Sequence, residues 1–413
     1  MIRVAILIDD FFPASGGIGR SVQTQLEELT ALGHEVTLIV PDRHLEKPRI
    51  GRVIECPSHY LNGLPAHLNV LHHSALRAQL ISRVAHFDVV HSQTERGAVV
   101  LAARLARLQG IPHVHTFHAN IAGTHQTVRE AVFGTLLYQW VINPVLASAS
   151  GRRSPTTRML PPELEPGGVA ARIDWQALAG IACKVDAVTA PSRFMLNLIE
   201  TAAGRSLDGH LVPTGYNRRI KAVIDATVRE RSDSGTRFLS VGRLSKEKRL
   251  DVLIRAFQLA GVDDSELVIV GDGDQAATLK RLASLGGNID FRGHVSALEH
   301  IAFEMRNADV LALTSYRFDN QPIVITEAVA AGLPILYCDD RLETGLSDAT
   351  SLLTGPGVEE LAEGIRRLCD PELRGRMSAA TEGLIEQLSP QLTAERYVQV
   401  YQEAIAKGRA ERG

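Results

Sequence analysis

Charged side chains gather at two places where an apolar run gives way to a helical pattern. The first is Val241–Arg249, in which the apolar run ends at Gly242 and a helix is predicted from Leu250. Arg243 presents a planar fork of donors and Lys248 a point charge, and two such cations near a helix start suit a diphosphate. A solvated basic helix start accounts for the same residues equally well, so both interpretations stay open for this motif alone.

The second place is Ser315–Ala328, where two carboxylates, Asp319 and Glu327, stand eight positions apart. A helix that begins near Pro322 has its proline in the first turn, where the missing N–H does no harm. One acid could hold sugar hydroxyls while the helix dipole and free amides hold a phosphate. The segment expected to face the crevice with Asp319 consists of Asn320, Gln321, Pro322 and Ile323. A capping acid with a surface glutamate fits poorly with so short and apolar a helix.

The first turn after the N-terminal apolar run is rich in glycine, with Gly16, Gly17 and Gly19. Glycines let backbone N–H groups approach a phosphate at a helix start. The spacing is not G-x-G-x-x-G, because Val22 stands where the third glycine belongs, and no clear ribose-binding acid follows the helix. Both features argue against an NAD fold. Taken alone, paired glycines are equally typical of a tight turn.

Three histidines, His113, His115 and His118, lie in and just after one predicted strand. His113 and His115 should share one face of the strand, whereas His118 should lie beyond its end. No cysteine or acid accompanies them, so we expect no metal site and a hydrogen-bonding role for His118. The pair Asp272 and Asp274 also has a metal-binding spacing, but its position after a parallel strand indicates an ordinary acidic loop.

Short apolar runs alternate with amphipathic segments along the whole chain. In the first half we expect strands at Val4–Ile8, Val36–Val40, Val89–His91, Val114–Phe117, Ala187–Ala190 and Leu211–Val212. In the second half we expect them at Phe238–Val241, Leu267–Val270, Ile289–Phe291, Val310–Leu313, Ile335–Tyr337 and Ser351–Leu353. Helices are expected between them, for example at Ser21–Leu32, Leu250–Leu259 and Val358–Leu368. Two series of about six non-alternating strands predict an α/β fold of two doubly wound, Rossmann-like parallel-sheet domains.

Two further stretches depart from this alternation. The apolar segment Val128–Leu146 is expected to pack in the core, and an interfacial membrane helix is the alternative. The loop Gly151–Gly168 carries several prolines and arginines and either has a function or covers a sheet edge.

Composition restricts the class of protein. The 413 residues are 45% hydrophobic with a net charge of −3, which excludes disorder and argues against a nucleic-acid binder. The four cysteines are far apart, so neither a disulfide scaffold nor a zinc knuckle is expected. The first apolar run is too short for a signal peptide, and no run reaches the roughly 18 residues of a membrane span. We therefore expect a cytoplasmic protein.

In combination these motifs resemble the retaining glycosyltransferases of family 4, the glycosyl transferases group 1. The resemblance covers nearly the whole chain. It is carried by Gly242–Lys248, Glu327-Ala328, Ala331–Pro334, Gly16-Gly17, Leu26–Val36 and Val212–Tyr216. One position departs from the family pattern, which is usually Glu-x7-Glu: the first acid here is Asp319, whose side chain is one carbon shorter.

The resemblance implies the GT-B fold, with two Rossmann-like domains facing a central cleft. It implies an acceptor-side domain at residues 1–214, a nucleotide-sugar domain at 215–388, and a C-terminal helix at 389–413 that packs back on the first domain. Acceptor contacts are expected in the first domain, from Cys56–His73, Ala119–Gln126 and the loop after Gly151.

The resemblance also implies roles for the residues above. Arg243 and Lys248 would bind the donor diphosphate and stabilise the leaving group, and Glu327 would hold the donor ribose. Asp319 and the backbone of Asn320–Ile323 would contact the donor sugar. The remaining implied contacts are Gly16 and Gly17 to the phosphates, His118 to the transferring sugar, and Arg292 and His294 beside the base.

We therefore predict a metal-independent, retaining glycosyltransferase that needs no cofactor. It would move a hexose from a UDP- or GDP-linked donor to a lipid or glycan acceptor, with peripheral membrane contact left open and no oligomeric state indicated. The alternatives are an epimerase or phosphorylase on the same fold, and a nucleotide-sugar-binding scaffold made inactive at Asp319.

Overall fold

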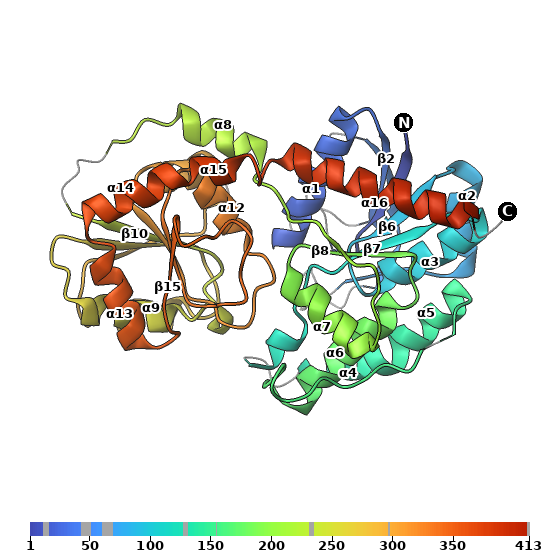
Figure 1. The fold of residues 1–413 in the computed structure, drawn as a ribbon, viewed down its shortest axis with the longest axis horizontal. Helices are drawn as coiled ribbons and strands as arrows, with labels where there is room; N and C mark the ends of the chain where they lie inside the picture. Colours follow the sequence, from blue (N-terminus) through green and yellow to red (C-terminus); the bar gives the residue numbers. More distant parts are fainter. Residues whose placement is uncertain are drawn as a thin grey trace. The chain divides into compact units, whose positions relative to one another are not determined.

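The computed structural model describes residues 1–10, 16–42, 51–59, 69–126, 131–153, 155–230, 235–295 and 298–410 (Figure 1). The chain divides into two compact units. Unit 1 comprises Met1–Pro213 and Pro390–Gly413, and unit 2 is Thr214–Ser389. These divisions each lie one residue from the boundaries expected after positions 214 and 388.

Unit 1 is built on a seven-stranded sheet in which every pair of neighbouring strands is parallel, in the order β3-β2-β1-β6-β7-β8-β9. The strands are β1 Arg3–Leu7, β2 Glu35–Pro41, β3 Arg52–Cys56, β6 Val89–Ser92, β7 His113–Thr116, β8 Ala187–Ala190 and β9 His210–Leu211. The sequence prediction missed β3. It is an edge strand with exposed Arg52 and Glu55, so it lacks the continuous apolar run of a central strand.

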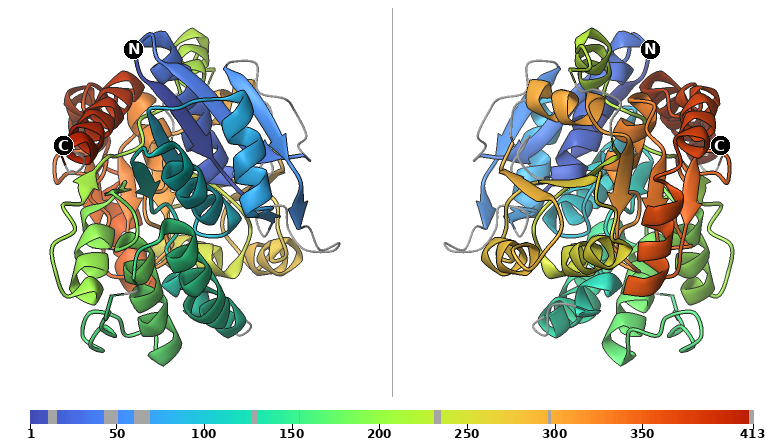
Figure 2. Two further views of the ribbon diagram at one scale, coloured as in Figure 1. Left: turned by 90° about the vertical axis from the view of Figure 1, so that its right-hand side faces the viewer. Right: turned by 90° about the vertical axis from the view of Figure 1, so that its left-hand side faces the viewer.

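Helices cover both faces of this sheet (Figure 2). They are α1 Gly16–Ala31, α2 Ala75–Val84, α3 Gly97–Gln109, α4 Ala131–Leu137, α5 Asn143–Ser150, α6 Val169–Ala182, α7 Arg193–Ala203 and α16 Pro390–Ala410. Alternate residues of β1 serve the two faces. Val4 and Ile6 pack with α1 and α16, whereas Ala5 and Leu7 pack with α2 and α3. The short elements η2 Ala122–Gln126, β4 Ser58–His59 and β5 Val70–Leu71 complete the unit.

Unit 2 contains a six-stranded parallel sheet in the order β12-β11-β10-β13-β14-β15. Its strands are β10 Arg237–Val241, β11 Glu266–Val270, β12 Ile289–Gly293, β13 Val310–Leu313, β14 Ile335–Tyr337 and β15 Ser351–Leu353, and all six segments expected from the sequence are present. Its helices are α8 Arg218–Ala226, η4 Lys246–Lys248, α9 Leu250–Ala260, α10 Ala276–Ala283, α11 Leu298–Arg306, α12 Ile323–Ala330, α13 Val358–Arg367, α14 Pro371–Ala380 and α15 Glu382–Ile385.

The C-terminal helix α16 packs against α1 in unit 1 (Figure 1). Its buried side includes Tyr397, Val400 and Tyr401, which join the core formed by α1 and one face of the sheet. The chain therefore leaves unit 1 after Pro213 and returns to it at Pro390.

The stretch after residue 130 departs from the sequence prediction. It forms α4, the π-helical turn η3 Tyr138–Ile142 and α5. Only one side of it packs in the core, where Tyr138, Ile142 and Leu146 are buried, while Trp140 is 72% exposed. Among the described residues, Val132–Ser150 has the length and apolar composition of a membrane span, and 33% of its most apolar window is buried.

Candidate active site

Parallel pairing brings the ends of the strands in each unit to a single edge of its sheet. The strand order reverses between β10 and β13 in unit 2, and between β1 and β6 in unit 1. Ligands of doubly wound folds bind beyond the carboxyl ends of the strands at such a reversal. In unit 2, Arg243 follows β10 and the segment Thr314–Asp319 follows β13, so the two charged motifs of the sequence flank the reversal.

The unit 2 site centres on an ion pair between two of the predicted residues. Lys248 Nζ lies 2.8 Å and 2.9 Å from the two carboxylate oxygens of Asp319. Ser315 Oγ donates to the same carboxylate, and Lys248 Nζ lies 5.6 Å from the centre of the Phe318 ring. The Lys248 and Asp319 side chains are 21% and 13% exposed, so solvent screens this pair less than a surface pair.

A sharp backbone turn and side-chain hydrogen bonds hold the η4 turn and the segment after β13 together. Arg249 has φ +52°, so the chain turns sharply between η4 and α9. Its guanidinium donates to Pro356 O at 2.6 Å and lies 5.6 Å from the Tyr316 ring. Thr314 Oγ1 donates to Lys248 O at 2.9 Å. The η4 turn is thus attached directly to the segment that carries Asp319.

Arg243 occupies a more open position in the same unit. Its side chain is 55% exposed, and Nη2 lies 3.1 Å from Glu247 Oε1. Ser245 Oγ donates to the same oxygen at 2.6 Å. Glu247 therefore orients a guanidinium whose charge remains accessible to solvent.

The helix α12 begins directly after the Asp319 segment. Pro322 is its N-cap residue, one position outside the helix and not in its first turn. Glu327 is 2% exposed, so it is not a surface glutamate, and Asn320 is 6% exposed. The side chain of Gln321 has a structural partner: it accepts from Thr214 N and donates to Thr214 O, both at 2.8 Å. The Gln321 side chain is therefore engaged by a contact within unit 2.

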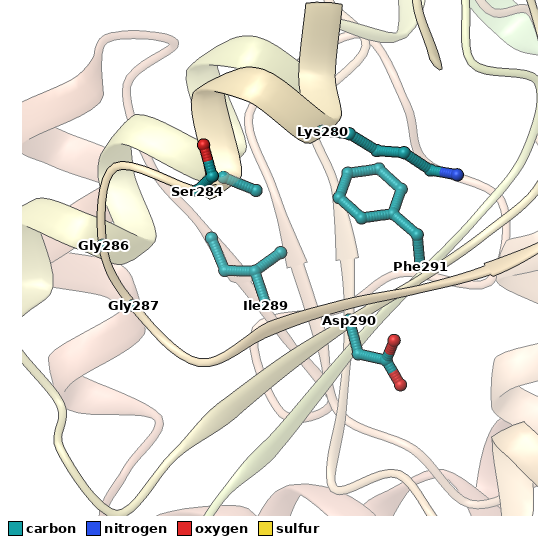
Figure 3. Close-up of a pocket in the computed structure, with 8 residues that line it drawn as sticks. Lys280, Ser284, Gly286, Gly287, Ile289, Asp290 and Phe291 are labelled. Carbon is teal, nitrogen blue, oxygen red and sulfur yellow. The ribbon is translucent and has the colours of Figure 1, made fainter. Parts of the chain in front are cut away.

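The segment at the end of β12 contains two more of the predicted residues, Arg292 and His294. Arg292 pairs with Asp290 at 2.9 Å and with Glu304 at 3.1 Å. Gly293 has φ +70° and accepts a hydrogen bond from Gly271 N at 2.8 Å, and His294 is exposed. A hollow of about 470 Å³ lies along the outer strand β12 and the end of α10 (Figure 3). None of the candidate site residues lines it.

In unit 1, the glycine turn is only partly described. Gly16 and Gly17 open α1, and residues 11–15 lie outside the described residues. His113 and His115 share one strand face as expected, because both lie within 2.8 Å of Ser92 Oγ. Within the described ranges, no group of three His, Cys, Asp or Glu side chains is placed to hold a metal ion.

His118 lies beyond the end of β7, as the sequence predicts, and belongs to a hydrogen-bonded chain of largely buried side chains. Its Nε2 lies 2.6 Å from Gln93 Oε1. Gln93 Nε2 donates to Gln25 Oε1 at 2.7 Å, and Gln25 Nε2 donates to Tyr401 Oη at 2.8 Å. Tyr401 Oη also lies 2.7 Å from His91 Nδ1. We call these five side chains the α16 network.

The α16 network determines the chemistry available to His118. An amide oxygen only accepts hydrogen bonds, so His118 must donate from Nε2. Burial lowers the pKa of His118 to about 4, so the ring is neutral near pH 7. Its Nδ1 atom is then a hydrogen-bond acceptor. No motif in the sequence points to Gln25 or Gln93, and Tyr401 fits an ordinary apolar helix face.

A second buried polar cluster lies at the reversal between β1 and β6. Asp9 accepts hydrogen bonds from Leu71 N at 2.8 Å and Ala98 N at 3.1 Å, and Asp10 forms an ion pair with Arg96. Burial raises the pKa of Asp10 to about 7 and that of Glu95 to about 8. Glu95 Oε1 is buried without a hydrogen-bond partner. In the sequence these two aspartates only follow the apolar run Val4–Ile8, which gives no sign of such a cluster.

The loop Gly151–Gly168 is fastened to unit 1 at several points. Arg152 Nη1 donates to Val185 O at 2.6 Å, and its other terminal nitrogen pairs with Asp186. Glu165 accepts from Trp175 Nε1 at 2.8 Å. These contacts support the interpretation that the loop covers part of the fold.

Comparison with known proteins agrees with this arrangement. Residues 15–219 match the family model described as Glycosyltransferase Family 4, and residues 226–383 match Glycosyl transferases group 1. The chain is 26% identical to a phosphatidyl-myo-inositol mannosyltransferase of Mycobacterium leprae, over 98% of both chains. It is 22% identical to an alpha-monoglucosyldiacylglycerol synthase of Streptococcus pneumoniae, over 81% of this chain and 70% of that one.

Solved structures show the same fold. A sucrose-phosphate synthase from Thermosynechococcus elongatus matches with a TM-score of 0.70 and 18% identity, over 98% of this chain and all of that one. Anabaena Alr3699/HepE, in complex with UDP and glucose, matches with a TM-score of 0.66 and 16% identity, over 97% of this chain and all of that one. The protein has the two-domain GT-B fold. It belongs to the glycosyl transferases group 1 and is a glycosyltransferase.

The α16 network predicts a specific loss of stability. Tyr401→Phe removes the hydroxyl that serves Gln25 and His91 and leaves buried polar atoms unpaired, so we expect a loss of about 1–3 kcal/mol in the free energy of unfolding. Urea denaturation followed by circular dichroism measures it. Tyr397→Phe is the matched control, because its hydroxyl lies 3.5 Å from Thr116 Oγ1 and should contribute less. Equal losses in the two variants would contradict this account.

The buried histidines predict a pH dependence of stability. Burial lowers the pKa of His91, His113, His115 and His118, in His113 and His118 to about 4. They stay neutral in the folded protein but bind protons in the unfolded chain below about pH 6.5. Unfolding therefore takes up protons, and stability falls as the pH is lowered from about 6.5 toward 4.

The raised pKa values of Asp10 and Glu95 act in the opposite direction, since the folded protein keeps those protons longer. Burial raises the pKa of Asp174 as well, so four buried histidines oppose three carboxyls, and the net effect of acidification is a loss of stability. Urea denaturation between pH 7 and pH 4.5 measures the slope. His118→Gln should reduce the slope by about one proton. Stability that is constant or rises with acidification in wild type would show that these groups are not neutral in the fold.

Proposed function

We propose that the protein is a retaining, metal-independent glycosyltransferase that moves a hexose from a UDP- or GDP-linked donor to a lipid or glycan acceptor. The observation that carries the proposal is the joining of Lys248 and Asp319 at the strand reversal of unit 2, next to Arg243 and the start of α12. Cations held beside a helix start are suited to the charge that develops on a departing diphosphate.

In this proposal Arg243 and Lys248 bind the diphosphate, and the buried carboxylate of Glu327 holds the donor ribose. Asp319 accepts hydrogen bonds from the sugar hydroxyls. It also neutralises Lys248 while the site is empty, because its two oxygens lie within 2.9 Å of the ammonium. Donor binding then exchanges one negative partner of Lys248 for another, which limits the cost of desolvating the lysine.

Unit 1 would supply the acceptor side. There the neutral His118 would accept a hydrogen bond from a sugar hydroxyl through Nδ1. The named relatives are a phosphatidyl-myo-inositol mannosyltransferase and an alpha-monoglucosyldiacylglycerol synthase, and these names support a lipid acceptor. A cytoplasmic enzyme with such an acceptor would associate with the membrane surface.

Calorimetric binding of UDP, GDP and ADP tests the donor site. We expect micromolar binding of one nucleotide by wild type. Binding should weaken by at least roughly tenfold in Arg243→Ala with Lys248→Ala, because two charge-assisted contacts are lost. Glu327→Ala should weaken binding of the nucleoside diphosphate through the ribose. The matched control is Arg255→Ala, a change on α9 that leaves the site residues intact.

Two results would overturn the proposal. One is the absence of binding of all three nucleotides to folded wild type. The other is binding that the double variant retains in full. A third result would identify the inactive scaffold instead. In that case wild type binds nucleotide but transfers sugar to no acceptor, and the Asp319→Glu variant does transfer sugar.

The Lys248–Asp319 pair gives a prediction of its own. Asp319→Asn removes the charge that competes with the diphosphate, so we expect nucleoside diphosphate affinity to rise by roughly three- to tenfold. Sugar transfer should fall, because the amide is a poorer acceptor for sugar hydroxyls. Calorimetry and product formation measure the two effects separately, with Asp319→Glu as the charge-conserving reference. Weaker nucleotide binding in Asp319→Asn would show that the carboxylate positions Lys248 and does not compete with phosphate.

A further inference from the structure

One helical face of unit 1 is apolar and open to solvent. Along α4 and η3, large apolar side chains are 38–72% exposed, and we call them the apolar ridge: Val132, Phe133, Leu136, Leu137, Trp140 and Val141. The opposite face of the same stretch, with Tyr138, Ile142 and Leu146, is buried in the core that contains Trp175 of α6. Figure 1 shows α4 and α5 running alongside α6 at the margin of unit 1.

The composition of this stretch is unusual for a surface helix. The twenty residues Ala131–Ser150 contain no Asp, Glu, Lys or Arg. A surface helix of a globular protein normally carries charges on its outer face. A contiguous apolar face of this kind marks a surface that contacts another apolar medium. Since its inner face belongs to the core of unit 1, the stretch lies along the surface and does not cross a bilayer.

The shape of the ridge favours a bilayer over a protein as its partner. The ridge is one helix wide and contains six large side chains, whereas a stable protein interface uses about 20–30 residues a side. Interfacial helices bury such a stripe about 5–10 Å into the boundary of head groups and acyl chains. Tryptophan is enriched at that boundary, and Trp140 is the most exposed side chain of the ridge.

A positively charged side chain lies just beyond the end of the same helical stretch. Arg153 lies two positions after Gly151, the C-cap of α5, and is exposed, whereas the neighbouring Arg152 is already paired with Asp186. An arginine beside an interfacial helix is attracted to anionic head groups. The ridge and Arg153 together have the two components of a peripheral membrane site.

We propose that the apolar ridge inserts into the surface of an anionic bilayer and holds unit 1 there. This inference rests on the proposed function in one respect: a lipid acceptor would be presented at that surface. The insertion itself needs only the ridge, so it can be tested apart from sugar transfer.

Co-sedimentation with vesicles of phosphatidylglycerol and phosphatidylcholine tests the proposal. We expect wild type to bind, and the fraction bound to fall at least tenfold in Phe133→Ser with Trp140→Ser. Both side chains are about 70% exposed, so the fold should tolerate the changes. Val228→Ser is the matched control, because Val228 is 75% exposed and lies in unit 2.

Tryptophan fluorescence gives a second readout. The chain has two tryptophans, and Trp175 is fully buried. A blue shift of emission on adding vesicles therefore reports Trp140, and in Trp140→Ser it should disappear. Nucleotide calorimetry without vesicles keeps the two proposals separate, because the double variant should bind nucleotide as wild type does.

The proposal is wrong if wild type does not sediment with these vesicles, or if the double variant sediments equally. It is also wrong if the ridge mediates self-association, seen as a dimer in solution that the double variant abolishes. In each case nucleotide binding by wild type would leave the proposed transferase function standing.

Discussion

Parallel pairing of strands is the constraint on which the candidate site residues of each unit depend. In a parallel sheet every strand ends at the same edge, and the loops that follow neighbouring strands must meet there. Lys248 and Asp319 are 71 positions apart in the sequence, yet they form an ion pair because β10 and β13 are neighbours. The same rule places the acids after β1 and β6 at one edge in unit 1.

Each unit also depends on polar groups that the fold keeps out of water. Buried polar atoms must find partners inside the protein. Tyr401, Gln25 and Gln93 are hydrogen-bonded one to the next, and Gln93 is bonded to His118. Through this chain the helix α16 fixes the tautomer of His118. In unit 2 the pair of Gln321 with Thr214 attaches the start of α12 to the segment where the chain enters the unit. Hydrogen bonds that stabilise the fold therefore also position residues of the candidate site.

The sequence predicted the architecture well for a physical reason. Central parallel strands must be continuously apolar, and this pattern is readable in one sequence, as β10 to β15 show. The sequence prediction missed the edge strand β3 because part of its surface faces water. The sequence made Arg243, Lys248 and Asp319 candidates because charged residues stand beside a helix start. The α16 network was not predictable, since Gln25 and Gln93 acquire a role only when a helix from the other end of the chain packs on them. The exposed face of α4 was expected only under the alternative of an interfacial helix, because an apolar run does not say which of its sides is covered.

The discontinuity of unit 1 also imposes an order of events during synthesis. All of Thr214–Ser389 is made before the last helix of unit 1 leaves the ribosome. Unit 2 is continuous, so it can complete its fold while unit 1 still lacks α16. Until Tyr401 emerges, Gln25 and His91 retain water as their hydrogen-bond partner. The sheet that is translated first is therefore completed last, and a nascent chain cannot hold His118 in its final state until α16 has been made.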